Sequence, residues 1–321
     1  MTPAIQVHHL RKSYPGENSK EKTVALRGID MTIEPGEFYG LLGPNGAGKT
    51  TTIGIITGLV KLQEGSVSVF GRDIVKEYRF TRSRIGVSPQ EFTSDWFFSI
   101  ERLLTFQAGY YGIPAKESRP RIEQLLHQFG LESKRNVKMR QLSGGMKRRF
   151  QIAKALVNDP DILILDEPTA GVDVELRRML WDYLRTLHKE GKTILLTTHY
   201  IEEAELLCQR VGIINDGKIV VEGAPSELIR SLGKESVEVH LAGWDPSYEE
   251  HLKPFTYAYT PDSAGGRLVF TVDSPEKQLS RIVESLTFDG IHIHKVKITK
   301  SSLEDVFITL TGRSIKDEVN G

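Results

Sequence analysis

Short apolar runs, each about the length of a buried strand, recur along the first two thirds of the chain. They predict strands at 38–42, 67–70, 85–88, 162–165, 193–197 and 211–214. Between several of these runs, apolar residues recur every three or four positions, which is typical of a helix that packs by one face. Strands that alternate with helices predict a largely parallel sheet covered by helices on both faces.

The residues that begin and end helices refine this prediction. The first helix is expected at 51–60, with apolar residues at 53, 56, 59 and 60. Another helix follows the strand at 162–165 and has apolar residues at 176, 179, 180, 183, 184 and 187. The expected caps and ends of the later helices are Ser99, Ser118 with Pro120 just after it, Gly130 and Gly191.

The two ends of the chain have a different pattern. Residues 1–40 predict three short strands at 5–8, 24–26 and 31–33, and the charged stretch 17–22 is expected to form an exposed hairpin loop. Near the C-terminus, apolar residues alternate at 237, 239 and 241 and again at 268, 270 and 272, which is typical of half-buried strands.

The C-terminal region continues with two helices and an irregular strand. Helices are expected at 275–287 and from Ser302, whose spacing to Asp305 matches a capping box, to Gly312. Between them, the apolar positions of 291–298 switch parity near Lys295, which predicts a β-bulge. We therefore expect one domain at 1–231, with a helical insert at about 91–158, and a small α+β accessory domain at 232–321.

Composition narrows the functional classes. Lys and Arg total 42, as do Asp and Glu, so the chain has no net charge that would attract nucleic acid, and no nucleic-acid partner is expected. No apolar run approaches the length of a membrane-spanning helix, and the N-terminus has no signal-peptide pattern. Cys208 is the sole cysteine and is interpreted as a packing residue. We expect a cytoplasmic protein.

Residues 43–50 read Gly-Pro-Asn-Gly-Ala-Gly-Lys-Thr and match a phosphate-binding loop at each required position. Glycines let the backbone N–H groups approach a polyphosphate, Lys49 adds a positive charge, and the Thr50 hydroxyl can bind Mg²⁺. The loop lies between a predicted strand and a predicted helix N-terminus, which favours anions. The predicted nucleotide-binding residues here are Gly43, Pro44, Asn45, Gly46, Ala47, Gly48, Lys49, Thr50 and Thr51.

Two carboxylates follow directly on a buried strand. The apolar run 162–165 leads into Asp166 and Glu167, and open α/β sheets bind ligands at the carboxyl ends of their strands. Asp166 is the expected Mg²⁺ partner, and Glu167 is expected to orient and polarise an attacking water.

Further motifs, in a fixed order, resemble those of the ATP-binding cassette (ABC) ATPases throughout residues 1–225. Leu142-Ser-Gly-Gly-Met146 resembles their signature motif, although Met146 replaces the usual Gln. The other matches are Gln90 with the Q-loop, Ala170-Gly-Val-Asp173 with the D-loop, His199 with the switch histidine, and Tyr14 with an aromatic residue that stacks on adenine.

The resemblance implies a P-loop NTPase fold with a mixed, mainly parallel sheet and an ATPase that uses ATP and Mg²⁺. It implies that Glu167, His199 and Gln90 are catalytic and that Thr50, Gln90 and Asp166 hold the metal. It also implies a homodimer, because each ATP is clamped between the phosphate loop of one subunit and the signature motif of the other. The residues expected to reach across are Ser143, Gly144, Gly145 and Asp173.

Three functions are compatible with these motifs. The segment 142–149 and Leu303-Glu-Asp-Val-Phe307 resemble those of ATPase subunits of drug, antibiotic and polysaccharide exporters. That favours a subunit on the inner face of the cell membrane that energises separate integral-membrane permease subunits. One alternative is a soluble ABC ATPase that acts on a macromolecular partner. The other is a non-hydrolysing ATP sensor, and the presence of Glu167 and His199 disfavours that sensor.

Several other groups are weaker candidates. His8-His9 and the alternating His292 and His294 are interpreted as exposed strand residues, because no further ligand stands at metal-binding spacing. The basic segment 147–149 is expected to form a solvated helix face. The aromatic residues at 96–98 and 110–111 fit either the core of the helical insert or a groove in which a membrane partner docks.

Overall fold

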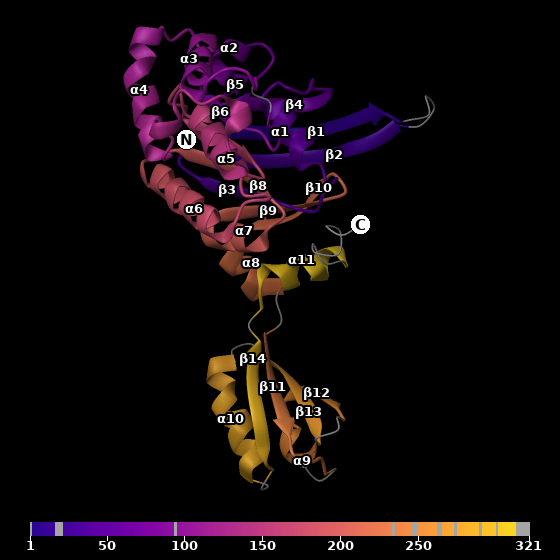
Figure 1. Ribbon diagram of the computed structural model, residues 1–321. Coiled ribbons are helices and arrows are strands. Elements are labelled where there is room, and N and C mark those ends of the chain that lie inside the picture. The colour runs from indigo at the N-terminus through magenta and orange to yellow at the C-terminus, as the bar shows by residue number, and fades with distance from the viewer. Residues whose placement is uncertain are drawn as a thin grey trace. The chain divides into compact units, whose positions relative to one another are not determined.

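The computed structural model describes residues 2–16, 22–92, 95–232, 235–245, 249–261, 265–272, 275–288, 291–299 and 301–312. Most of the predicted hairpin loop at 17–22 lies outside the described residues. The chain divides into two compact units, one that extends to Pro225 and one that begins at Ser226 (Figure 1). The expected boundary at 231/232 falls at the end of helix α8 (Pro225–Leu232), inside the second unit.

A six-stranded sheet lies at the centre of the first unit, in the order β10-β9-β3-β8-β7-β6. All neighbouring strands in this sheet are parallel except β10, which pairs with β9 in antiparallel register. Every residue of β3, β7 and β8 is buried, as expected for strands covered on both faces. The strands are β3 (Phe38–Leu42), β6 (Ile85–Ser88), β7 (Ile162–Asp166), β8 (Thr193–Thr198), β9 (Arg210–Asn215) and β10 (Lys218–Gly223).

A second, antiparallel sheet in this unit has the order β2-β1-β4-β5. The strands are β1 (Ile5–Pro15), β2 (Lys22–Ile33), β4 (Glu64–Val69) and β5 (Arg72–Asp73). The prediction of three short N-terminal strands is therefore wrong, because two long strands form instead. Register shifts along β1 and a left-handed backbone at Gly28 (φ 102°) let the pairing continue between the predicted strands at 24–26 and 31–33.

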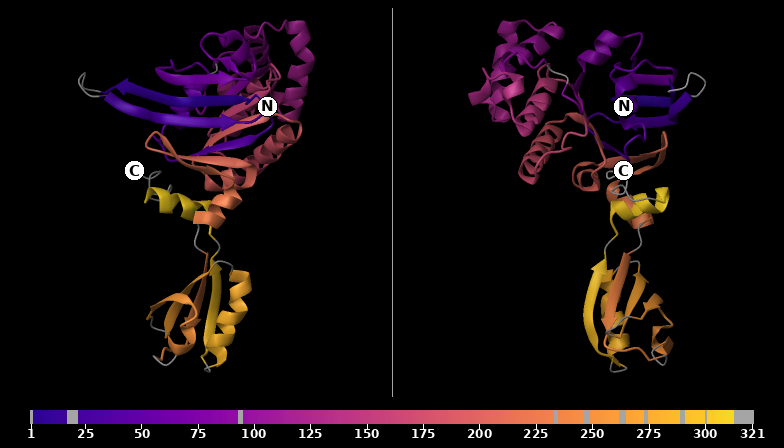
Figure 2. Two further views of the ribbon diagram at one scale, coloured as in Figure 1. Left: turned by 180° about the vertical axis from the view of Figure 1, so that it is seen from behind. Right: turned by 45° about the vertical axis from the view of Figure 1, so that its right-hand side comes forward.

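Helices cover the central sheet and form the helical insert (Figures 1 and 2). One helix begins earlier than predicted. Pro114 takes the N-cap position of α4, so Ser118 lies in the first turn, where its hydroxyl donates to Ala115 O. The α-helices of this unit are α1 (Lys49–Ile56), α2 (Tyr78–Ser83), α3 (Ile100–Tyr110), α4 (Ala115–Gln128), α5 (Gly144–Ala155), α6 (Val174–Lys189) and α7 (Ile201–Leu207); 3₁₀ turns form at Glu132–Lys134 and Met139–Gln141.

The other predicted helix ends agree more closely with the structure. Ser99 takes the N-cap position of α3, although its side chain makes no capping hydrogen bond. Gly130 and Gly191 have left-handed backbones just beyond the ends of α4 and α6. Leu59 lies beyond the end of α1 and is 75% exposed, so the predicted helix at 51–60 is too long.

The main core of this unit contains side chains of both sheets and of α1. Ile5 and Leu26 come from the antiparallel sheet, Ile164 comes from β7, and Ile53 comes from α1; all are at most 3% exposed. Cys208 is also buried, as a packing residue should be, and its burial raises the pKa of the thiol. This packing fixes the carboxyl ends of β3, β7 and β8 relative to α1.

The second unit contains a four-stranded antiparallel sheet in the order β12-β13-β11-β14. Its core cluster includes Val239, Phe270 and Ile282, each 0% exposed, and Ile282 lies on α10, which packs against the sheet. The elements are β11 (Glu235–Leu241), α9 (Glu249–Leu252), β12 (Thr256–Thr260), β13 (Gly266–Val272), α10 (Pro275–Phe288), β14 (Ile293–Thr299) and α11 (Leu303–Thr311), in addition to α8.

Two predicted details of this unit are confirmed. His240 pairs with Lys295 and Leu241 pairs with Ile293, so His294 is the extra residue of a β-bulge. Ser302 and Asp305 form a capping box at α11, which ends at Gly312 in a left-handed conformation. In neither unit is any helix in the described part of the chain long and apolar enough to cross a membrane.

Candidate nucleotide-binding site

The loop between β3 and α1 has the tight backbone expected of a phosphate loop. Gly46 and Gly48 have positive φ values of 80° and 109°. A Cβ atom at Gly43 would approach Ile214 O to 2.3 Å, and one at Gly48 would approach Ala25 O to 2.8 Å. Gly43 therefore requires glycine for steric reasons, Gly46 for conformational reasons, and Gly48 for both.

Lys49 lies at the start of α1 and is only 4% exposed. Its Nζ donates to Gly43 O at 2.8 Å and to Pro44 O at 3.0 Å, and so holds the ammonium group against the loop. The same Nζ lies 3.2 Å from Glu167 Oε1. A buried ammonium group requires such partners, because an unpaired charge in this position would be costly.

The carboxyl end of β7 supplies the two predicted carboxylates, which are 3% and 5% exposed at Asp166 and Glu167. Thr197 Oγ1 donates to Asp166 Oδ1 at 2.5 Å. Glu167 has a left-handed backbone (φ 47°), which is uncommon outside glycine, and its N–H donates to Thr197 O at 3.1 Å. Strand β8 therefore orients both residues at the end of β7.

Glu167 is where the other predicted catalytic residues converge. Gln90 Nε2 donates to Glu167 Oε2 at 3.1 Å. His199 Nδ1 lies 3.1 Å from the same oxygen. The structure thus brings together Lys49, Gln90, Glu167 and His199, which are distant in sequence.

The charge on Glu167 follows from these contacts. Burial favours the neutral form and raises the pKa of the carboxyl, but His199 and Lys49 outweigh burial, so the pKa lies below its ordinary value. Glu167 is therefore ionised at neutral pH and can accept a proton from a bound water.

The expectation that 147–149 form a solvated helix face is wrong for Arg148, which is only 4% exposed. Its guanidinium donates to Pro89 O at 3.3 Å and to Gln90 O at 3.2 Å. Gln151 Nε2, one turn further along α5, donates to Glu91 O at 2.7 Å. Helix α5 is therefore hydrogen-bonded to the backbone that carries Gln90, a contact between distant segments that no local pattern indicates.

The residues predicted to reach the nucleotide of a second subunit lie apart from the loop at 43–50. Ser143 caps α5, and its Oγ accepts from Met146 N at 3.3 Å. Ser143 and Gly144 are exposed, and no hydrogen bond or ion pair joins them to residues 43–50, all of which the structure describes. Met146 contributes only its backbone N–H to the cap. Asp173 is exposed at the N-cap of α6.

Other sequence candidates do not join this site. Tyr14 is 37% exposed at the end of β1, with Lys12 Nζ 5.2 Å from its ring centre, and its contact with adenine stays a prediction. His8, His9, His292 and His294 are exposed. Within the described ranges, no group of three or more His, Cys, Asp or Glu side chains could hold a metal ion.

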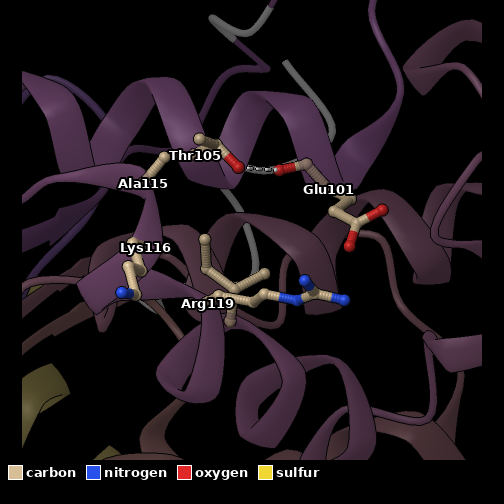
Figure 3. Close-up of a pocket in the computed structure, with 6 residues that line it drawn as sticks. Glu101, Thr105, Ala115, Lys116 and Arg119 are labelled. Atoms are coloured by element: carbon tan, nitrogen blue, oxygen red, sulfur yellow. Dashed lines mark hydrogen bonds between the residues drawn. The ribbon is translucent and has the colours of Figure 1, made fainter.

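A hollow of ≈ 400 Å³ lies elsewhere, in the helical insert (Figure 3). Its lining comes from α3 and α4 and includes no predicted site residue: Glu101, Thr105, Ala115, Lys116, Arg119 and Ile122. The candidate site lies elsewhere, beyond the ends of β3, β7 and β8.

A glycine-rich loop with a buried lysine, beside an ionised carboxylate at the end of a parallel strand, defines a phosphate-loop ATPase. Comparisons with known proteins place it more closely. A family model described as "ABC transporter" matches residues 26–170. A second model, described as "ATP-binding protein DrrA1-3-like, C-terminal domain", matches residues 223–311.

Whole-length relatives and solved structures agree with these models. The chain is 41% identical over 303 residues to the Nod factor export ATP-binding protein I of Burkholderia thailandensis, covering 94% of this chain and 96% of that protein. The protein of the same name from Cupriavidus metallidurans is 39% identical over 324 residues, covering 99% and 100%.

Two structural neighbours carry the same fold. The ATP-binding subunit of an ABC transporter matches with a TM-score of 0.64 and 28% identity, covering 72% of this chain and 93% of that chain. A dimeric ATP-binding cassette in a post-hydrolysis state with ADP and Pi also has a TM-score of 0.64 and 28% identity, covering 68% and 98%. The chain belongs to the ABC transporter family as an ATP-binding subunit, and it is an ATPase.

Proposed function

We propose that this chain is the ATP-hydrolysing subunit of an exporter, and that it acts as a homodimer with separate membrane-spanning permease subunits. The observation that carries this proposal is the convergence of Lys49, Gln90 and His199 on Glu167. The names of the relatives support export over action on a soluble macromolecular partner. With such partners, we place the chain on the cytoplasmic face of the membrane.

We assign the phosphates of ATP to the loop at 43–50 and to Lys49, whose ammonium group already faces the loop carbonyls. The exposed Thr50 hydroxyl, the Gln90 amide and the free oxygen of Asp166 are hard oxygen donors, so these residues fit Mg²⁺. When bound, Mg²⁺ neutralises charge on the phosphates.

Glu167 is assigned as the residue that accepts the proton of the attacking water, because its lowered pKa keeps it ionised. Gln90 and His199, both at 3.1 Å from Glu167 Oε2, hold that carboxylate in place. In this assignment His199 also contacts the γ-phosphate, and its ring is 11% exposed, so it can face a ligand.

We assign the exposed cap of α5 to the nucleotide of a second subunit. Ser143 and Gly144 present a helix N-terminus with free N–H groups, which favour an anion. Gly145 and Asp173 complete this assignment. The dimeric form of the structural neighbour with ADP and Pi supports such an arrangement. ATP would then join two subunits, and its hydrolysis would release them.

We assign the binding of the permease to the aromatic segment that follows Gln90. Trp96, Phe97 and Tyr110 are 40%, 69% and 84% exposed, so the alternative that they form the core of the insert is wrong for these three residues. Exposed aromatic side chains are typical anchors of protein interfaces. We propose residues 232–321 as an accessory domain.

Glu167→Gln tests the proposed function. The variant should bind ATP with the affinity of the wild type, lose turnover at least about 100-fold and elute as a dimer when ATP and Mg²⁺ are present. Glu202→Gln is the matched control, because Glu202 is exposed and the chemical change is the same. Unchanged hydrolysis in Glu167→Gln would contradict the assignment.

A further inference from the structure

Glu203 is a buried carboxylate that the assigned site does not use. It lies in the first turn of α7 and is 0% exposed. Three neutral donors converge on it. Trp181 Nε1 donates to Oε1 at 3.2 Å, Thr198 Oγ1 donates to Oε2 at 2.7 Å, and the Thr169 hydroxyl donates to Oε1. No Lys, Arg or His in the described residues forms an ion pair with it.

The three donors come from segments that carry assigned site residues. Thr169 follows Glu167 by two positions and stands directly before the loop that ends at Asp173. Trp181 lies on α6, the helix that Asp173 caps. Thr198 stands directly before His199. One carboxylate therefore joins the loop beyond β7, helix α6 and the end of β8.

The bond to Thr198 also fixes the backbone around His199. Because Thr198 Oγ1 donates its proton to Glu203, its lone pairs are free to accept from Tyr200 N, at 2.8 Å. The carbonyl of Thr198 accepts from Gly43 N at 3.3 Å, at the start of the phosphate loop. The peptide units on both sides of His199 are therefore held, and the Thr198 hydroxyl is oriented by Glu203.

A carboxylate suits this place better than any other side chain. It offers only acceptors, and its two oxygens can take all three protons. A glutamine of the same shape would bring an NH₂ group against at least one of these donors. The Thr198 hydroxyl would then have to turn, or Thr169 and Trp181 would lose their acceptor.

We propose that Glu203 is a positioning residue for ATP hydrolysis. It holds two segments in one fixed arrangement. One is His199, which contacts Glu167, and the other is the loop from Thr169 to Asp173, which follows Glu167 in the chain. The inference rests on the proposed function, since it needs a chain that turns over ATP. Glu203 itself touches neither Glu167 nor the phosphate loop in any hydrogen bond or ion pair of the described residues.

Steady-state hydrolysis by the full chain tests this. Glu203→Gln should lower kcat by about 10-fold and leave KM for ATP within about twofold, because binding residues are untouched and only the arrangement for hydrolysis is loosened. Thr169→Val should lower kcat in the same way, and the double variant should lose no more than the stronger single variant. Thr169→Ser restores the hydroxyl and should recover most of the lost rate.

Two controls separate positioning from general stability. Glu202→Gln makes the same chemical change on the exposed side of α7 and should leave kcat unchanged. Leu207→Ala removes a buried apolar side chain, 7% exposed, from the same helix and should lower the melting temperature with little effect on kcat. If Glu203→Gln does not fold, Thr169→Val and Thr169→Ser give the same comparison.

The possible outcomes distinguish this inference from the proposed function. One outcome would overturn the inference alone. In it, the wild type hydrolyses ATP, Glu167→Gln abolishes that turnover, and Glu203→Gln and Thr169→Val have normal kcat. A fall in kcat no larger than that of a variant with an equal loss in melting temperature, such as Leu207→Ala, would overturn it equally. A wild-type chain that binds but never hydrolyses ATP would overturn both.

Discussion

Both units have an apolar core, but among the described residues only the ATP-binding unit also buries charged side chains. In the first, Lys49, Arg148, Glu167 and Glu203 are all at most 5% exposed. In the second, the described core cluster consists of apolar residues, such as Val237, Leu268 and Phe270. Both interiors contain fully buried side chains, so burial alone does not distinguish them.

The difference shows what buried charge indicates. An ionised side chain loses its free energy of hydration on burial, and pairing with an opposite charge seldom recovers more free energy than was lost. An apolar core holds a fold together without that cost, as the C-terminal unit does. The clustering of paired charges at the ends of β3, β7 and β8 is therefore typical of a reactive site, where catalysis needs groups with shifted pKa values.

The largest expected effect is on stability and lies in the C-terminal unit. Phe270→Ala removes a fully buried ring and should lower the free energy of unfolding of that unit by about 3–5 kcal/mol. Affinity for ATP should stay within about twofold, because no assigned nucleotide residue lies in this unit. Urea unfolding and nucleotide titration measure the two quantities.

The control for this variant is Ile298→Ala, at a position that is 37% exposed and should cost clearly less. Loss of ATP binding in step with the stability of Phe270→Ala would show that the two interiors are not independent.

Lys49→Ala comes next and acts on the other interior. It removes the charged donor that we assign to the phosphates, so ATP affinity should fall about 10- to 100-fold. It also leaves His199 as the remaining side chain that can carry a positive charge within 4 Å of Glu167 among the described residues. Calorimetric titration with ATP measures the change. Lys116→Ala, at an exposed position on α4, is the matched control, and equal affinities in the two variants would refute the role of Lys49.

Most elements could be predicted from the sequence, since they depend on short-range periodicity and on local signals. The capping box of α11, the bulge near Lys295 and the strand at 162–165 are of this kind. The break predicted within β2 was wrong because pairing with β1 continues across polar residues. Hydrogen bonding to a neighbouring strand is a tertiary effect that outweighs local composition.

The site could be predicted only in part, for the same reason. The loop at 43–50 is contiguous, so its residues are recognisable from spacing. Arg148 bonds to Gln90 across 58 positions, and Thr169 bonds to Glu203 across 34. Neither partner is marked by its sequence neighbours: Arg148 stands in a basic run and Glu203 in an acidic helix turn. Such contacts emerge only when the fold joins distant segments.

A smaller effect should appear in the pH dependence of stability. The pKa of Glu167 is lowered in the folded chain, so its ionised form stabilises the fold above the pKa of the unfolded state. That contribution is lost as the pH falls through the folded pKa. The stability difference between wild type and Glu167→Gln should therefore shrink below about pH 4.5. A difference that grows on acidification would show that the pKa is raised instead.

The smallest expected effect returns to the C-terminal unit and to a polar contact at its surface. Ser302 Oγ accepts from Asp305 N at 3.3 Å, and Asp305 Oδ2 accepts from Ser302 N at 2.8 Å. Ser302→Ala removes one half of this capping box and should cost about 1 kcal/mol. Ser302→Asn keeps a capping oxygen and should lose only a few tenths of a kcal/mol.

Urea unfolding of the two Ser302 variants, with ATP turnover in parallel, sharpens the contrast between the two units. Ser302→Ala should lower the urea midpoint of the same unfolding transition that Phe270→Ala lowers. It should leave turnover unchanged, because the capping hydrogen bonds lie at the start of α11 and involve no charged residue of the assigned site. Equal stability of Ser302→Ala and Ser302→Asn would mean that the cap contributes nothing. A loss of turnover would mean that α11 acts on the catalytic interior, against the division into an apolar scaffold and a charged site.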